Sequence, residues 1–397
     1  MTITLPNTAN ASAIQAMAAG DRKRARDILE RAIALEPNSL QVWLNYAGLL
    51  RASGEEDAAM DALTQALRVE PRSFHALLMK GLIHDKRGHA TEAGRAFALA
   101  LTFAPPADRL DAATNAALDR ARDVYQTYID GLTDQVWQAV NAQSSGYTQQ
   151  ERRRLNKFVD LATGKIKRYD SHPSDFFFPD LPQLEFYDDE LFPWLKTYES
   201  YTPHVIEEFT AYAQRGMDGF KPYVSIPVGA PVDQWAELNN SVRWTSLLLK
   251  KNGKIVEEYA PLFPKTLEAL SHADQPVTHN RSPVSMISAL QPHTRIPPHH
   301  GVSNARLVLH LPLIVPENCG FRVGSETREW VVGKAWVFDD CVEHEAWNGS
   351  DKLRVVLLAD VWNPFLTTYE RDQYDVVLRA MDTFHNEVEL PDSLAYL

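Results

Sequence analysis

Five of the thirteen histidines fall between residues 293 and 344, and imidazole is a common protein ligand for transition metals. These five are His293, His299, His300, His310 and His344. His299 and His300 are adjacent, and successive side chains of a strand point to opposite faces, so at most one of them faces a shared site. His344 follows 45 residues after His299, among acidic residues. A lone buried histidine is usually structural, whereas two that converge are able to bind a metal ion.

Arg354 lies within the apolar segment LRVVLLADVW, which predicts a buried strand. A buried cation is unfavourable unless it meets an anion. The sequence leaves two partners open: the carboxylate of a bound ligand, or an internal ion pair with Asp360 or Glu345. A histidine pair beside a buried guanidinium favours an iron site next to a carboxylate pocket.

The elements that must position these residues are strands from about Ser285 onward. Arg306–Leu313 alternates apolar and other residues, and this period of two puts Arg306 and His310 on one face. Further short strands are predicted over 335–338, 343–347 and 353–361. Asn348-Gly349 predicts a hairpin between the last two of these strands. Short strands separated by Gly and Asn turns favour a β-sandwich or jelly roll.

Helical patterns flank these strands. They cover 189–207, 254–270 and 367–385, although Pro261 and Pro264 must interrupt the second of them. The fold class expected for the C-terminal half is therefore a sheet-based domain with flanking helices.

Three segments of this region together carry a resemblance to a known family. PPHHGVSNARLVLHL (297–311), FDDCVEHEAW (338–347) and LRVVLLADVWNP (353–364) resemble the aspartyl/asparaginyl β-hydroxylase family. Members of that family are double-stranded β-helix oxygenases that use Fe(II) and 2-oxoglutarate. The match is strongest from about Ser285 to Pro364 and weaker through 176–195 and 235–251.

The resemblance implies a role for each matching residue. His299 and His344 are the implied iron ligands. Arg354 is implied to bind the distal carboxylate of 2-oxoglutarate, helped by Ser288, and His310 to contact the end nearer the metal. Gly301 stands where the wider oxygenase superfamily has a carboxylate ligand, and the family resembled here also has glycine at that point.

Val308 is a departure from the family pattern. The family usually has an arginine two residues before the histidine that corresponds to His310, and that arginine helps to hold an anionic group of substrate or cosubstrate. Its loss weakens the expectation of an acidic substrate. Arg306, on the same strand face, is the residue expected to replace it in part.

The N-terminal region has a different organisation, because four sets of residues recur every 34 positions. They are Gly20, Gly54 and Gly88; Pro37, Pro71 and Pro105; Ala25, Ala59 and Ala93; and Ala32, Ala66 and Ala100. In the second copy one helix ends before Gly54 and another runs from about Glu55 to Val69, where Pro71 terminates it. The pattern resembles tetratricopeptide repeats over roughly residues 6–105, and the helical segment 107–141 is expected to cap them.

The repeats have two interpretations that the sequence leaves open. They provide a concave surface that recruits a peptide or protein, or they stabilise the neighbouring domain or a dimer. The expected domains are a tetratricopeptide-repeat helical domain over 6–145, a linker over 146–175 and an oxygenase domain over 176–397. This is a two-domain α + β fold: an all-α solenoid followed by a double-stranded β-helix of the jelly-roll or cupin type.

Composition excludes several classes of protein. The 397 residues carry a formal net charge of −12, which disfavours nucleic-acid binding. No stretch approaches the roughly 18 apolar residues of a membrane span. Cys319 and Cys341 are too few for a disulfide framework. We therefore expect no nucleic-acid or membrane partner and a cytoplasmic location, with the oligomeric state open.

The function expected is hydroxylation by an Fe(II)- and 2-oxoglutarate-dependent dioxygenase. The expected target is an Asp- or Asn-like β-carbon of a peptide or protein, which the repeats recruit. Two alternatives remain. One is a non-catalytic tetratricopeptide interaction scaffold, which the absence of the family arginine at position 308 favours, and the other is a hydroxylase of small molecules or lipids.

Overall fold

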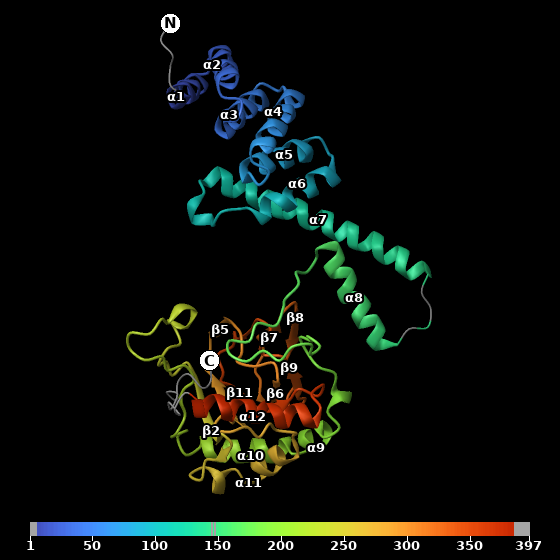
Figure 1. The fold of residues 1–397 in the computed structure, drawn as a ribbon, viewed down its shortest axis with the longest axis vertical. Helices are drawn as coiled ribbons and strands as arrows, with labels where there is room; N and C mark the ends of the chain where they lie inside the picture. Colours follow the sequence, from blue (N-terminus) through green and yellow to red (C-terminus); the bar gives the residue numbers. More distant parts are fainter. Residues whose placement is uncertain (1–5, 144–145, 147, 385–397) are drawn as a thin grey trace. The chain divides into compact units, whose positions relative to one another are not determined.

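The computed structural model describes residues 6–143, 146 and 148–384 (Figure 1). The chain divides into two compact units, Met1–Ile166 and Lys167–Leu397. The first unit is entirely helical where it is described, and the second combines two antiparallel sheets with helices. This confirms the two-domain α + β class. The C-terminal residue of the helix expected over 367–385, His385, lies outside the described residues.

The first unit begins with three helix pairs that follow the 34-residue period. The helices are α1 (Pro6–Ala18), α2 (Arg22–Leu35), α3 (Leu40–Ala52), α4 (Glu56–Val69), α5 (Phe74–Lys86) and α6 (Ala90–Thr102). Gly20, Gly54 and Gly88 lie between the two helices of each pair with φ of 78°, 81° and 73°. This left-handed conformation favours glycine, which explains why the position recurs.

Small residues allow the paired helices to approach closely. Ala25, Ala59 and Ala93 are completely buried at equivalent positions of α2, α4 and α6. Gly81 of α5 faces Phe97 of α6 so closely that an added Cβ would lie 2.4 Å from the phenyl ring. The periodic small residues therefore encode the packing of the repeats.

Two further helices complete the first unit, α7 (Ala112–Gln143) and α8 (Gln149–Thr163). Helix α8 occupies much of the segment expected as a linker over 146–175. Thr148 and Glu151 form a capping box at its start, and Gly164 ends it with φ of 81°. The helix begins with the polar run QQERRR, and Leu155, Phe158, Val159 and Ala162 then follow helical spacing, so both its termini and its apolar spacing mark it as a helix.

The second unit contains a large and a small antiparallel sheet. The large sheet comprises β1 (Lys221–Pro222), β2 (Trp244–Lys251), β4 (Ser285–Leu290), β11 (Arg354–Trp362), β6 (Arg306–Ile314) and β9 (Trp336–Phe338) in that spatial order, with β3 (Lys254–Ile255) paired to β2. The small sheet has the order β5 (Thr294–His299), β10 (His344–Asn348), β7 (Cys319–Val323) and β8 (Glu326–Glu329).

The large sheet is covered by helices on one face and turns its other face to a cavity. Leu307, Leu309 and Leu357 belong to the core that the sheet forms with α9 (Leu195–Ser200), α10 (Thr202–Ala213) and α11 (Pro264–His272) (Figure 1). The alternate residues Arg306 and His310 line the cavity. The period of two thus places them on one face, as the sequence predicts.

The predicted hairpin at Asn348-Gly349 is wrong. Strand β10 pairs with β5 and β7 in the small sheet, whereas β11 pairs with β4 and β6 in the large one. The buried Asn348 side chain donates from Nδ2 to the carbonyl oxygens of Leu290 (3.0 Å) and Lys352 (2.8 Å). The turn therefore connects the small sheet to the large one. Its Asn348 side chain is hydrogen-bonded to the end of β4, and the two strands that flank the turn do not pair with each other.

The hairpin signal belongs instead to Asn252-Gly253. These residues have φ of 50° and 81° and connect β2 to β3, and β3 falls within the segment predicted as helix over 254–270. Positive φ at both central residues is the requirement of a two-residue hairpin turn. Helix α11 begins only at Pro264, at a position of the first turn where proline is tolerated. The predicted helix after residue 366 is α12 (Thr368–Phe384).

Candidate active site

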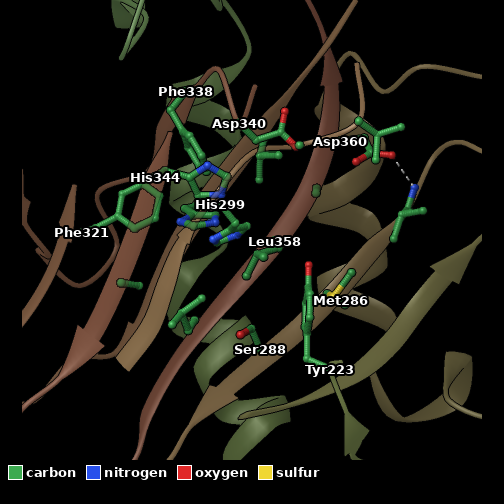
Figure 2. A pocket seen from close by; sticks show the side chains of 18 of the residues that line it. Tyr223, Met286, Ser288, His299, Phe321, Phe338, Asp340, His344, Leu358 and Asp360 are labelled. Carbon is green, nitrogen blue, oxygen red and sulfur yellow. Dashed lines mark hydrogen bonds between the residues drawn. The ribbon is translucent and has the colours of Figure 1, made fainter. Parts of the chain in front are cut away.

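His299 and His344 lie directly opposite each other across the two sheet-forming strands β5 and β10. Their ring centroids are 4.0 Å apart, and both rings line the cavity between the sheets (Figure 2). Strand pairing thus brings together two residues separated by 45 positions in the chain. The structure places the sequence-predicted pair in one site.

Hydrogen bonds fix the tautomer of both rings. Nδ1 of His299 donates to the Pro297 carbonyl oxygen (2.8 Å), and Nδ1 of His344 donates to that of Val342 (3.1 Å). Each Nε2 therefore carries the lone pair that a metal ion requires. Burial lowers the pKa of His299 to about 4 and that of His344 well below its usual range. Two neutral, oriented imidazoles fit a divalent iron ion.

Aromatic rings enclose the two imidazoles. Trp235 lies 5.0 Å from His299, measured between ring centroids. Phe338 and Phe321 lie 5.4 and 6.0 Å from His344 by the same measure (Figure 2). These side chains keep water away from that part of the cavity, which strengthens electrostatic interactions within it.

Arg354 lies in the same cavity and has no carboxylate partner among the described residues. Its side chain is 2% exposed, and its Nε has no hydrogen-bond acceptor. Burial lowers the pKa of Arg354 to about 10. The two internal partners left open by the sequence are engaged elsewhere: Asp360 pairs with Arg306, and Glu345 pairs with Arg295 and Arg322.

Two other predicted residues accompany Arg354. Ser288 accepts a hydrogen bond from the indole of Trp244 (3.1 Å). His310 stacks on Trp330 with ring centroids 5.3 Å apart, and its Nδ1 has no partner. Burial and the nearby Arg354 hold the pKa of His310 well below its usual range, so its ring is neutral. These unsatisfied buried polar atoms fit the carboxylate of a ligand such as 2-oxoglutarate.

Asp340 is a cavity residue that the sequence reasoning did not assign to the site. Its carboxylate lies against Gly301, where an added Cβ would be 2.1 Å from Oδ2. The Gly301 backbone N–H donates to the Asp340 carbonyl oxygen (2.6 Å). Burial raises the pKa of Asp340 to about 7. The available signal was its position in the turn between the buried strand 336–338 and His344.

Asp339 and Cys341 form the rest of that turn. Asp339 Oδ1 accepts from the Cys341 backbone N–H (2.9 Å), a contact typical of an aspartate in a turn. Their side chains and that of Asp340 lie within 4.8 Å of one another. Burial raises the pKa of the Cys341 thiol far above its usual range, so the thiol is protonated and a poor ligand. Cys319 is likewise free and buried.

Arg306 lies in the cavity but is not free to replace the missing family arginine. Its Nη1 donates to Asp360 Oδ1 (2.8 Å), while Asp360 Oδ2 accepts from the Ser282 hydroxyl and the Val284 backbone N–H (both 3.0 Å). The expectation that Arg306 holds an anionic cosubstrate or substrate group is therefore not supported by its contacts.

The two remaining histidines of the group have other partners. His300 also lines the cavity, and its ring meets His172 edge-on with centroids 5.8 Å apart. The exposed His293 pairs with Asp351 (2.8 Å). The adjacent His299 and His300 therefore both line the cavity, although only His299 lies against His344.

No helix in the described part of the chain is long and apolar enough to cross a membrane.

Comparison with known proteins gives two family matches. Residues 207–364 match the family described as aspartyl/asparaginyl beta-hydroxylase, and residues 16–82 match the tetratricopeptide repeat. The first match contains both imidazoles, Arg354 and the strands that position them.

Three relatives illustrate the range of similar proteins. The chain is 36% identical over 129 residues to an aspartyl/asparaginyl beta-hydroxylase of Mus musculus, covering 32% of this chain and 17% of that protein. It is 32% identical over 182 residues to an ornithine lipid ester-linked acyl 2-hydroxylase of Rhizobium tropici, covering 45% of this chain and 60% of that protein. An aspartate beta-hydroxylase domain-containing protein 2 of Xenopus tropicalis is 26% identical over 257 residues, covering 63% of this chain and 67% of that protein.

The alignments to the mouse and Rhizobium proteins thus span less than two thirds of those proteins' own lengths. Residues 207–364 of the C-terminal unit thus match the aspartyl/asparaginyl β-hydroxylase family, and residues 16–82 of the N-terminal unit match the tetratricopeptide repeat.

Proposed function

We propose that the chain is an Fe(II)- and 2-oxoglutarate-dependent hydroxylase that acts on an amino-acid side chain of a peptide or protein. The observation that carries this proposal is the combination of two neutral imidazoles and one buried, anion-free guanidinium in a single cavity. Bound iron supplies the chemistry by which one atom of O₂ enters a substrate C–H bond while the other oxidises 2-oxoglutarate to succinate and CO₂.

The residues of the chain bind and orient the reactants. His299 and His344 hold the metal through Nε2, because each Nδ1 is fixed on a backbone carbonyl. Arg354 binds the carboxylate of 2-oxoglutarate that is farther from the metal, and this contact replaces the anion that its buried charge lacks.

His310 and Ser288 complete the cosubstrate pocket. His310 is neutral, so it hydrogen-bonds the cosubstrate without adding charge. The Trp244 indole fixes the orientation of the Ser288 hydroxyl from the neighbouring strand. The phenyl rings of Phe321 and Phe338 exclude water from the metal-binding pair, which limits side reactions.

The test is succinate formation by the purified full chain with Fe(II), 2-oxoglutarate and O₂. We expect slow release without substrate and faster release with substrate, and loss of both in His344→Ala. A second readout is thermal stability, which should rise with Mn(II) plus N-oxalylglycine and not with N-oxalylglycine alone. No succinate and no metal-dependent stabilisation would reject the proposal.

The repeats are proposed to recruit the peptide or protein substrate. Their support is the match of residues 16–82 to a repeat family and the regular helix pairs of the first unit. A chain beginning at Lys167, where the second unit starts, should retain succinate release and lose turnover at low substrate concentration. An unchanged KM would instead favour a purely stabilising role.

A second candidate function is hydroxylation of a lipid acyl chain. The observation that favours it is the 32% identity to the Rhizobium tropici protein, whose name describes an acyl 2-hydroxylase. Mass spectrometry of lipids and of tryptic peptides from cells with and without the chain distinguishes the two functions, because only one fraction gains oxygen.

A further inference from the structure

The charged residues that line the cavity away from Arg354 favour a substrate side chain that carries no charge. Apart from histidines, the cationic residues among the described lining residues are Arg354 and Arg306. Arg354 and Asp360 are six residues apart on β11, which corresponds to about 20 Å along a strand. Once Arg354 binds a cosubstrate carboxylate, Arg306 is the one remaining cationic side chain, apart from histidines, among the described lining residues. It lies near Asp360, at the other end of the cavity.

Arg306 is already neutralised at that end. It forms an ion pair with Asp360, and its charge also interacts with that of Asp340. Asp360 in turn is held by two further hydrogen bonds, from Ser282 and Val284. A substrate carboxylate would meet two acidic groups around one guanidinium, and burying an unmatched anion is unfavourable.

The surface between the two ends is apolar. Leu358 pairs across the sheet with Met286 on one side and with His310 on the other, and Val308 pairs with Asp360. Val308 and Leu358 are only partly buried, because they face the cavity. Figure 2 shows Leu358 and Met286 across the cavity from the imidazole pair.

We infer that the side chain hydroxylated by this protein is uncharged and aliphatic, in contrast to the acidic side chain that the family resemblance suggests. This inference rests on the proposed function and specifies the substrate class of the same site. An aliphatic side chain packs against Val308, Leu358 and Met286 and leaves the Arg306–Asp360 pair intact. The tetratricopeptide repeats of the first unit favour a peptide or protein substrate over a lipid, because such repeats bind peptides and proteins.

The experiment compares peptide pools that differ only in the central residue. The full chain with Fe(II) and 2-oxoglutarate is incubated with capped heptapeptides of random flanks and a central Leu, Val, Asn or Asp, and the gain of one oxygen is measured. Leu, Asn and Asp have nearly the same shape, so charge and polarity are the variables. We expect the Leu and Val pools to gain at least about tenfold more oxygen than the Asp pool, because an unmatched buried charge is unfavourable by more than 1.4 kcal/mol.

A pair of variants tests the assigned cause. Val308→Arg places a cation beside Asp360 and should raise oxidation of the Asp pool, whereas Val308→Met adds length without charge and should keep the preference for aliphatic pools. A readout without turnover uses Zn(II) and N-oxalylglycine. Under these conditions capped leucine amide should raise the melting temperature more than capped aspartate amide.

Each result decides the inference. Equal or greater oxidation of the Asp pool overturns it, and the highest oxidation in the Asn pool overturns its aliphatic part. Oxidation of an octanoyl amide probe with no oxygen gain in any peptide pool overturns the choice of a peptide, as does succinate release with no product at all. Absence of both succinate release and metal-dependent stabilisation rejects the proposed hydroxylase itself, and this inference with it.

Discussion

The carboxylate of Asp340 fills the space that a side chain at Gly301 would need. An added Cβ at Gly301 would lie 2.1 Å from Asp340 Oδ2 and 2.2 Å from its carboxyl carbon. Two segments separated by 39 positions are thus complementary: one lacks a side chain and the other directs a buried carboxylate at it. The φ of Gly301 does not lie in the left-handed region, so backbone conformation does not require glycine here. The close contact with Asp340 does.

Gly301→Asp should therefore lower the free energy of unfolding by about 1–3 kcal/mol or more, through overpacking and the approach of a second carboxylate. Urea unfolding followed by tryptophan fluorescence measures the change. Combining it with Asp340→Gly removes the obstruction, and the double variant should recover most of the loss. If Gly301→Asp alone is as stable as the parent chain, the contact between these residues does not constrain the site.

His344→Ala should abolish metal binding while leaving the fold intact. The side chain supplies one of only two imidazoles in the pair, so we expect affinity for Mn(II) to fall by at least about a hundredfold. Calorimetric titration measures the affinity and circular dichroism the fold. His300→Ala is the matched control, since the His300 ring meets His172 and is not one of the two paired imidazoles, and it should bind metal like the parent. Loss of binding in both variants would contradict the assignment.

Arg354→Met should separate binding from stability. Removing the guanidinium should raise the KM for 2-oxoglutarate by about thirtyfold or more, equivalent to about 2 kcal/mol of a buried charged contact. The ligand-free protein should be equally stable or more stable by about 1 kcal/mol, because an unpaired buried cation is replaced by an apolar chain of similar size. Steady-state kinetics and urea unfolding give the two values. A destabilised protein with unchanged KM would indicate a structural role.

Asp360→Asn should destabilise the second unit by about 3–5 kcal/mol, since the buried Arg306 then loses the carboxylate that it is hydrogen-bonded to. Chemical denaturation measures the loss. Asp351→Asn is the comparison, because Asp351 is 95% exposed in its pair with His293 and should change stability by less than about 0.5 kcal/mol. Similar effects of the two substitutions would mean that the Arg306–Asp360 pair contributes little.

Two glycines on neighbouring repeat helices should respond in opposite directions to substitution by alanine. Gly81→Ala places a Cβ 2.4 Å from Phe97 and should destabilise the first unit by about 1–3 kcal/mol. Gly48→Ala has no atom within 4 Å of the new Cβ and should stabilise helix α3 by about 0.5–1 kcal/mol. Differential scanning calorimetry separates the two, and succinate release without substrate should stay unchanged in both. A stabilising Gly81→Ala would contradict the packing described.

Several features of the protein follow from local sequence signals alone. The 34-residue period predicted the repeat helices, because glycine, alanine and proline act within one or two turns of a helix. The alternation in Arg306–Leu313 predicted which of its side chains share a face, because a strand has a period of two. Residue spacing also singled out His299, His344 and Arg354 as residues with possible chemistry.

Other features depended on which strands pair, and local signals do not specify that. Asn348-Gly349 and Asn252-Gly253 have the same two letters, yet only the second closes a hairpin, because the Asn348 side chain is bonded to the end of β4. Helix α8 lies in the segment expected as a linker, because its first six residues are polar and two of its apolar residues, Phe158 and Leu161, remain exposed.

The cavity itself was decided by tertiary structure. The partner of Arg306 lies 54 positions away on β11, and the carboxylate beside Gly301 comes from the turn before β10. Side-chain types and periodicity thus determine what each strand presents, whereas long-range pairing decides which charges neutralise one another. For that reason the sequence singled out His299 and His344, which the fold brings together, and only the folded chain showed that Arg306 is paired with Asp360 while Arg354 has no carboxylate partner among the described residues.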